Sequence, residues 1–144
     1  MSFLPDTCFF SEFTKASPNA QVVAWSDRQP ESTLYLSVLT LGELQQGISQ
    51  MDPSPRRQEL EDWLHQELIP RFSGRLLEIT PEVALAWGRI QGEARRRGKP
   101  RSVMDSLIAA TAKVHGLAVV TRDVDNMQGM GVELVNPWAS GPSC

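Results

Sequence analysis

Short apolar runs alternate with longer stretches of helical spacing along this chain. The apolar runs cover residues 3–5, 33–38, 75–79, 117–121 and 132–135. Between them, apolar side chains recur every three or four residues, as they do on one face of a helix. Because parallel strands that follow one another must be joined by crossovers, usually helical ones, this order predicts an α/β fold with a mostly parallel sheet.

Several helix ends are marked by residues with known positional preferences. Thr80 is placed to cap the helix that follows it, and Gly116 is placed to end the helix over residues 102–116. Pro70 is expected to end or kink the helix over residues 58–72, because proline lacks a backbone N–H. The spacing directs four residues of the later helix inward, namely Leu107, Ala110, Thr111 and Val114.

The length of 144 residues fits one domain, predicted over residues 1–138, with residues 139–144 as a disordered tail. The 41% of apolar and 22% of charged residues are typical of a globular protein that needs no membrane. No run approaches the ~20 apolar residues of a membrane span, and the start lacks the basic segment of a secretory signal. A cytoplasmic location is therefore expected, with Cys8 and Cys144 as free thiols.

Four acidic residues stand where an apolar run gives way to a helix or loop: Asp6, Glu43, Asp105 and Asp123. In parallel α/β sheets, ligands bind beyond the carboxyl ends of the strands, so these side chains are expected at one edge. Two carboxylates about 5 Å apart at an effective dielectric constant of about 20 repel by roughly 3 kcal/mol. A hard divalent cation, Mg²⁺ or Mn²⁺ rather than zinc, would relieve that repulsion. The pattern therefore predicts metal-dependent phosphodiester chemistry.

Each acid, taken alone, also has a structural explanation. Residues 40–43 and residues 102–105 both have the spacing of a capping box, in which a hydroxyl and a carboxylate satisfy free N–H groups of a helix. Asp6 would cap the first helix, and Asp123 would serve as a turn residue. These explanations account for each local position but not for four acids at one edge.

A basic run contrasts with the acidic character of the whole chain. The formal net charge of −3 and the pI of about 5.4 argue against a protein that coats nucleic acid by bulk charge. Five cations nevertheless surround one predicted helix end: Arg95, Arg96, Arg97, Lys99 and Arg101. Two interpretations are open, a solvated helix terminus favoured by the helix dipole, or a group of phosphate contacts beside the acidic site.

Signatures of other chemistries are absent from the sequence. There is no GxGxxG, no GxxxxGK[ST] and no GxSxG, which excludes the usual dinucleotide, P-loop and hydrolase motifs. His65 and His115 show no ligand spacing with each other or with a cysteine, and Cys8 is more typical of a small core residue than of a nucleophile.

Four stretches of the sequence carry a family resemblance: LPDTCFFSE, LSVLTLGELQQGI, VMDSLIAATAKVHGLAVVTRD and GVELVNPW. Through them the chain resembles the PIN-domain ribonuclease toxins of the VapC type, and most closely the FitB-like branch. The resemblance implies a three-layer α/β/α fold with a twisted sheet and Mg²⁺- or Mn²⁺-dependent endonucleolytic cleavage of RNA. It also implies a homodimer silenced by a cognate VapB/FitA-like antitoxin, through which the pair binds its promoter DNA.

The resemblance makes four acids the catalytic set: Asp6, Glu43, Asp105 and Asp123. Asp6 and Asp105 are then metal ligands, and Asp125 is an alternative to Asp123 as the fourth acid. Cys8 stands where these toxins usually have asparagine. The competing hypothesis is a catalytically silent PIN-like domain that binds RNA or a protein partner, and the complete set of four acids favours the nuclease.

Overall fold

Five short strands form the centre of the structure, a computed structural model that describes residues 1–139. They are β1 (Phe3–Pro5), β2 (Leu36–Ser37), β3 (Leu76–Leu77), β4 (Ala118–Val120) and β5 (Leu134–Val135). β1 pairs with β4, β4 with β5 and β2 with β3, always in parallel. A parallel bridge between Phe3 and Leu34 joins the two groups, so that the strands follow the order β3-β2-β1-β4-β5.

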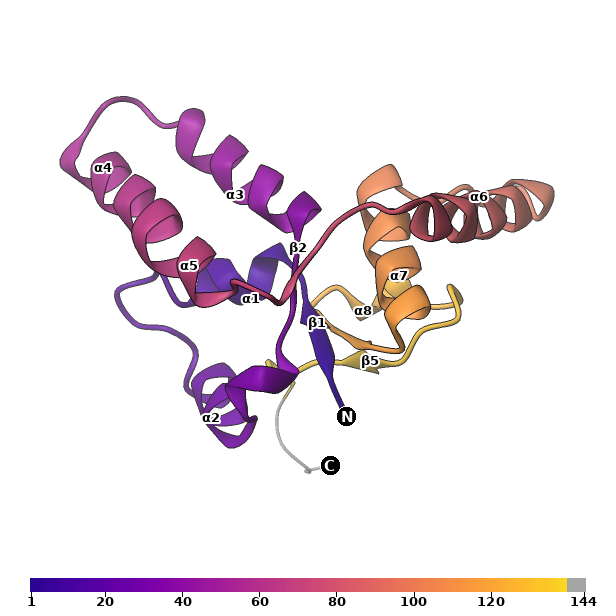
Figure 1. Cartoon of the computed structure of the whole chain (residues 1–144), viewed down its shortest axis with the longest axis horizontal. Coiled ribbons are helices and arrows are strands. Elements are labelled where there is room, and N and C mark those ends of the chain that lie inside the picture. Colours follow the sequence, from indigo (N-terminus) through magenta and orange to yellow (C-terminus); the bar gives the residue numbers. More distant parts are fainter. Residues whose placement is uncertain (140–144) are drawn as a thin grey trace.

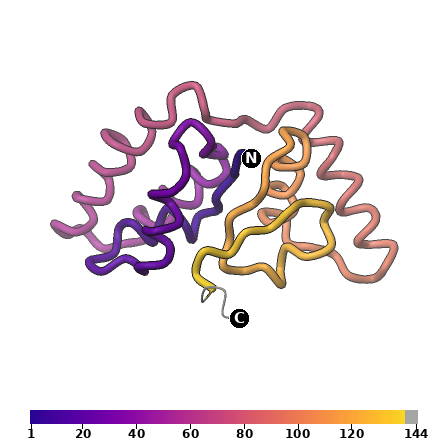
Figure 2. Tube along the Cα trace, turned by 90° about the horizontal axis from the view of Figure 1, so that it is seen from below, coloured from indigo at the N-terminus to yellow at the C-terminus, as the bar shows by residue number. Residues whose placement is uncertain are grey.

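Helices cover both sides of these strands, which confirms the predicted α/β fold. They are α1 (Thr7–Glu12), α2 (Ala20–Arg28), α3 (Val38–Ser49), α4 (Pro55–Asp62), α5 (Ile69–Arg71), α6 (Pro81–Arg96), α7 (Val103–His115) and α8 (Val124–Met127), with a 3₁₀ turn η1 (Glu31–Thr33) and a π-helical segment η2 (Trp63–Leu68). Figure 1 shows α6 and α7 on one side of β1 and α3, α4 and α5 on the other. The same division is visible from below in Figure 2.

The core is divided by the alternation of side chains along the two central strands. Phe3 and Val120 belong to one buried cluster, whereas their neighbours Leu4 and Val119 belong to another. Successive side chains of a strand point to opposite faces, so a strand covered by helices on both faces must be apolar at every position. The uninterrupted apolar runs in the sequence have this cause.

Helix α3 begins earlier than the capping-box spacing of residues 40–43 predicts. Ser37 is the N-cap, and its side chain accepts a hydrogen bond from the N–H of Leu39 at 3.1 Å. Thr40 is fully buried, and its hydroxyl has no hydrogen-bond partner within residues 1–139. A capping box at Thr40 is therefore wrong, because serine caps as well as threonine and β2 ends directly at Ser37. Glu43 consequently lies beyond the first turn of α3.

The helix ends at Arg71, one residue after Pro70, and is distorted directly before the proline, in agreement with the prediction that Pro70 ends or kinks it. A π-helical segment, η2, directly precedes α5, and Pro70 lies inside α5 at one of its first positions. A wider π turn changes which carbonyl each N–H reaches, which accommodates a residue that has no N–H of its own. The helix therefore continues to Arg71, with the disturbance placed before the proline rather than after it.

The inward face of α7 differs in part from the prediction. Ala110 and Thr111 are buried, but Val114 is 37% exposed, and Ile108, Ala109 and Ala112 are buried instead. Helix α7 lies between the sheet and α6, so two faces are covered where the spacing argument assumed one. Gly116 ends the helix with a positive φ of 67°, as predicted.

The remaining differences concern the extents of elements. The strand predicted over residues 33–38 is limited to Leu36–Ser37, and the segment after β4 contains the short helix α8. Of the predicted tail, residues 140–144 lie outside the described residues. Within residues 1–139, no helix combines the length and the hydropathy that crossing a bilayer requires.

Candidate metal centre

Two of the predicted acids follow neighbouring strands at the point where the strand order reverses. Asp6 comes directly after β1, and its N–H donates to the Val120 carbonyl of β4 at 2.9 Å. Its carboxylate caps α1 by accepting from the N–H of Phe9 at 3.3 Å. Asp123 follows β4 and is the N-cap residue of α8. Since β2 and β3 lie on one side of β1 and β4 and β5 on the other, this edge is the expected ligand position of a parallel sheet.

The two carboxylates converge with the thiol of Cys8. One potential ligand atom each of Asp6, Cys8 and Asp123 lies within 4.8 Å of the other two. The buried Thr121 connects the acids, because its hydroxyl donates to the Asp6 carboxylate while accepting from the N–H of Asp123 at 2.9 Å. The Cys8 Sγ lies 3.7 Å from an Asp123 carboxylate oxygen, to which it donates.

The electrostatics of this group favour a bound cation. Burial, and to a lesser degree the negative charge of Asp123, raises the pKa of Asp6 from 3.8 to about 6, against the hydrogen bonds that lower it. Burial and the charges of Asp6 and Asp123 likewise raise the pKa of Cys8 to about 11, so the sulfur is a neutral thiol near pH 7. An adjacent positive charge would reverse both effects.

The donor set fits a hard divalent ion. Asp6 and Asp123 offer carboxylate oxygens, and a protonated thiol is a poor competitor for the soft metals that prefer thiolate. No histidine belongs to the group within the described part of the chain, so the nitrogen ligands that zinc usually takes are missing there. These residues therefore suit Mg²⁺ or Mn²⁺.

Glu43 and Asp105 lie outside the group defined by the 4.8 Å limit. Glu43 accepts a short hydrogen bond from the hydroxyl of Thr7, the residue after Asp6, so α3 is tied to the start of α1 beside the centre. Asp105 lies half-buried in the first turn of α7, and its N–H donates to the Ser102 cap at 3.0 Å. Asp125 is exposed on α8 and does not belong to the group either.

The basic run is divided between several roles. Arg96 and Arg97 both pair with Glu93, at 3.1 and 3.3 Å. The Arg101 guanidinium donates to the backbone carbonyls of Asn126, at 2.9 Å, and Gln128. Arg95 and Lys99 are exposed. Arg101 therefore holds the end of α8, which no local pattern indicated.

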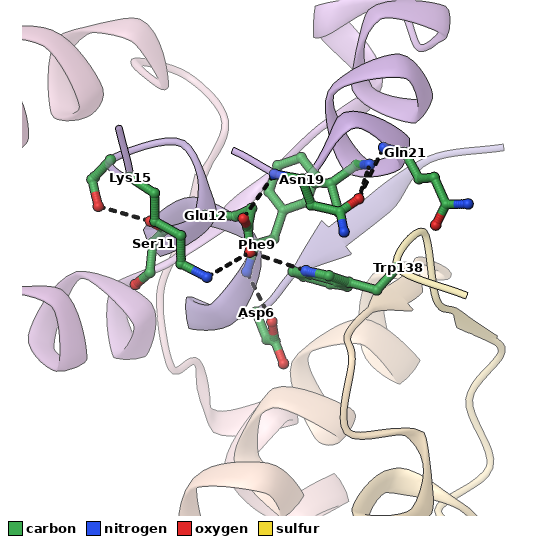
Figure 3. A network of polar contacts seen from close by, with 10 residues as sticks. Asp6, Phe9, Ser11, Glu12, Lys15, Asn19, Gln21 and Trp138 are labelled. Atoms are coloured by element: carbon green, nitrogen blue, oxygen red, sulfur yellow. Dashed lines mark hydrogen bonds and ion pairs between the residues drawn. The ribbon is translucent and has the colours of Figure 1, made fainter. Parts of the chain in front are cut away.

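Another carboxylate, that of Glu12, lies at the other end of α1 from Asp6 and is surrounded by hydrogen-bond donors (Figure 3). It is 4% exposed and accepts from the Trp138 indole N–H at 3.0 Å, the Asn19 N–H at 2.9 Å and the Lys15 ammonium at 3.1 Å. These donors, the indole first, lower the pKa of Glu12 from 4.5 to about 2. The Trp138 ring also lies under the guanidinium of Arg122, at 5.3 Å, next to Asp123.

Sequence reasoning missed three of these residues. Thr7 and Thr121 contact predicted acids, and their adjacency to Asp6 and Asp123 in the sequence was the available signal. Glu12 had no such signal, because Trp138 lies 126 residues further along the chain.

Comparison with known proteins shows similarity over most of the chain. The model of the PIN domain family matches residues 3–130. "VapC ribonuclease Y4jK" of Sinorhizobium fredii is 37% identical over 133 residues, which cover 92% of this chain and 95% of that protein. "Toxin FitB" of Neisseria gonorrhoeae is also 37% identical, over 94% of this chain and 97% of that protein.

Solved structures show the same similarity. The structure titled "Structure of FitAB bound to IR36 DNA fragment" contains a chain with a TM-score of 0.90 and 33% identity, covering 99% of both chains. The FitAcB crystal structure from Neisseria gonorrhoeae matches with a TM-score of 0.90 and 36% identity, over 96% of this chain and 99% of that one. A DNA-bound VapBC from Salmonella typhimurium matches with a TM-score of 0.79 and 25% identity, over 96% and 99%.

Proposed function

Because this chain belongs to the PIN-domain family, we propose that it is a divalent-metal-dependent endoribonuclease and the toxin of a type II toxin–antitoxin pair. The observation that carries the proposal is the convergence of Asp6 and Asp123 within 4.8 Å at the strand ends, with the Asp6 pKa raised to about 6. Asp6 is partly buried and Asp123 is exposed, and neither forms an ion pair with any residue in the range 1–139, so a hard ion would supply the missing positive charge.

The four predicted acids would have different roles in phosphodiester hydrolysis. Asp6 and Asp123, with Asp105 at the start of α7, would hold Mg²⁺ or Mn²⁺. When bound, such an ion polarises a phosphate oxygen and lowers the pKa of a water. Glu43, oriented by the Thr7 hydroxyl, would align that water or take its proton. Water adds to phosphorus and the bond to the 3′ oxygen breaks, which leaves a 3′-hydroxyl and a 5′-phosphate.

The proposed partners follow the matched FitAB and VapBC complexes, two of which are bound to DNA. We infer a cognate VapB/FitA-like antitoxin that silences the nuclease and mediates contact with promoter DNA. The protein would act as a homodimer in the cytoplasm.

Replacing Asp6 with asparagine tests the proposal. Asparagine caps a helix as well as aspartate, so the fold is retained while a metal ligand is lost. Cleavage of total bacterial RNA in Mg²⁺ or Mn²⁺, read by mapping the new 5′ ends, should fall by about a hundredfold or more. Asp27→Asn, at an exposed position of α2, is the matched control and should cut like the wild type.

Undiminished cleavage by Asp6→Asn would remove Asp6 from the mechanism. A wild-type protein that binds RNA yet cuts none in either metal would instead support the catalytically silent binding module. The first result concerns cleavage by the variant and the second concerns cleavage by the wild type, so the two outcomes are distinguishable.

A further inference from the structure

A cavity of about 710 Å³ lies between α6, α7 and the loop that follows α8. Its charged lining consists of five cations and one acid: Arg89, Arg97, Lys99, Arg101, Lys113 and Glu93. This local excess of positive charge stands in a chain whose formal net charge is −3. The cavity is therefore electrostatically distinct from the rest of the molecule.

The loop over residues 129–131 lies beside these cations and leaves room for their side chains. Met130 is buried, 4% exposed, and anchors the loop in the core, while Gly129 and Gly131 on either side have positive φ angles of 82° and 78°. A Cβ atom at Gly129 would lie 2.9 Å from a guanidinium nitrogen of Arg101, and one at Gly131 would lie 3.1 Å from the Lys113 Nζ. The two glycines thus keep the cavity open where larger residues would displace the cations.

Three of the cations have neither an acidic partner nor a backbone carbonyl that accepts from them. Arg97 pairs with Glu93, and Arg101 is held by backbone carbonyls. Arg89, Lys99 and Lys113 form no ion pair with any residue in the described range 1–139. Their mutual repulsion is unrelieved, so an anionic ligand would be attracted there.

The helix dipole explains only part of this arrangement. Arg97 and Lys113 lie at the ends of α6 and α7, where cations are favoured. Arg89, however, lies in the middle of α6, and the dipoles give no reason for three separate segments to direct cations into one cavity.

The cavity is close to the metal centre along the chain. Gly129 comes six positions after Asp123, a stretch that even fully extended spans at most about 22 Å. Arg101 directly precedes the Ser102 cap of the helix that carries Asp105. A strand that crosses the centre would therefore reach the cavity within about six nucleotides, since each strand of a B-form duplex already carries one charge per ~3.4 Å.

We propose that this cavity binds backbone phosphates of the RNA strand a few nucleotides away from the cleaved bond. The inference rests on the proposed function, because it assumes that RNA is the substrate. A recessed site suits a flexible single strand better than a rigid duplex, and phosphate contacts position a strand without reading its sequence. Of the predicted run, Lys99 is the unpaired contributor, and Arg89 and Lys113 join it from outside the run.

The test compares two triple variants with the same change in net charge. Arg89→Gln/Lys99→Gln/Lys113→Gln alters the cavity, whereas Arg28→Gln/Arg56→Gln/Arg71→Gln removes three cations from α2, α4 and α5, on the other side of the molecule (Figure 1). Binding of a fluorescein-labelled single-stranded RNA 20-mer, chosen at about the upper site size of such proteins, is measured by anisotropy in EDTA over a series of salt concentrations. Thermal melting in the same buffer verifies that both variants are folded.

The cavity variant should bind the RNA about tenfold more weakly than the control variant, and its salt slope should be lower by about 2, as expected for three lost phosphate contacts. With metal present, its KM should rise while kcat is unchanged. Equal losses in the two variants, or no RNA binding by the wild type, would overturn the proposal. Tighter binding of a 20-bp DNA duplex with the same dependence on the cavity would also overturn it and assign the site to DNA.

The anisotropy assay contains no metal and needs no cleavage. A protein that fails to cut RNA would therefore refute the proposed nuclease and leave the test of the cavity intact.

Discussion

The two ends of helix α1 hold carboxylates in opposite situations. Asp6, at the start, faces the acid Asp123 and a neutral thiol, and its pKa is raised to about 6. Glu12, at the end, accepts hydrogen bonds from an indole, a backbone N–H and an ammonium group, and its pKa is lowered to about 2. Burial opposes ionisation in both cases; it is the largest influence on the pKa of Asp6, whereas the hydrogen bond from the Trp138 indole is the largest influence on the pKa of Glu12.

This contrast separates a carboxylate whose charge the protein itself stabilises from one whose charge it does not. Glu12 is satisfied by the protein itself and joins three segments of the chain, α1, the loop before α2 and the region around Trp138. Asp6 is ionised at a cost in stability that the protein alone does not recover. A group kept in that condition at a strand edge is typical of binding or catalytic sites.

Removing Glu12 should have the largest effect on stability. Glu12→Ala leaves the partly buried indole N–H of Trp138 and N–H of Asn19 without their acceptor and opens a gap at the buried Glu12 position, which should lower the free energy of unfolding by about 3 kcal/mol. Urea titration at pH 7 measures it. Glu59→Ala, which removes an exposed ion pair with Arg56, is the control and should change stability by at most about 0.5 kcal/mol. Similar effects of the two substitutions would contradict the structural role of Glu12.

Metal should stabilise the Asp6 end and leave the Glu12 end unchanged. Mn²⁺ at a free concentration of about a hundred times its Kd should add about 2.7 kcal/mol to the wild type, which raises the Tm by several degrees. The Glu12→Ala protein should gain the same increment, and the Asp6→Asn/Asp123→Asn protein should gain none. Thermal melting with NaCl at matched ionic strength checks this. A full shift in the double variant would place the ion elsewhere.

Without metal, Asp6→Asn should be more stable than the wild type at pH 7, by about 1–2 kcal/mol, because the buried charge is removed and the helix cap is kept. The sign follows from the pKa, which is 3.8 for the ordinary carboxyl and about 6 in the folded protein. The favourable contribution of Asp6 is complete below pH 3.8 and is lost as the pH rises through 6. Urea titrations in EDTA across this range should show the gap between variant and wild type opening with pH. Asp27→Asn should show no such gap.

Trp138→Phe should weaken the Glu12 end by about 1 kcal/mol, since it removes one hydrogen bond to a carboxylate and keeps an aromatic ring. Glu12 has a lowered pKa, so its contribution is complete above pH 4.5 and is lost as the pH falls toward 2. In the variant, this acid loss should move to higher pH. Trp63→Phe is the control, because the Trp63 indole donates no hydrogen bond to any described residue. An unchanged acid profile in Trp138→Phe would show that the indole does not control the charge of Glu12.

Much of the fold follows from local patterns in the sequence. The cap at Thr80, the stop at Gly116 and the apolar runs of β1 and β4 are all found where predicted, because each depends on backbone geometry within a few residues. The predictions that failed concern features that are not local. The start of α3 was decided by the end of β2, and the buried face of α7 by the packing of α6 against it.

The candidate site was predictable to a similar degree. Placing Asp6 and Asp123 at the ends of parallel strands was enough to bring them together, since the carboxyl ends of such strands share one edge. Cys8 was expected in the core, yet it joins the acids because it lies two residues after Asp6, in the first turn of α1.

The sequence by itself determined the order of strands and helices, the parallel sheet and the acids that stand at its edge. Only the tertiary structure decided which carboxylate has enough hydrogen-bond donors to stabilise its charge and which does not. It also decided which cations line the same cavity. The reason is physical: periodicity and capping act over a few residues, whereas the charge state of a buried group depends on every neighbour that packing brings to it. For Glu12 that neighbour, Trp138, is 126 residues away.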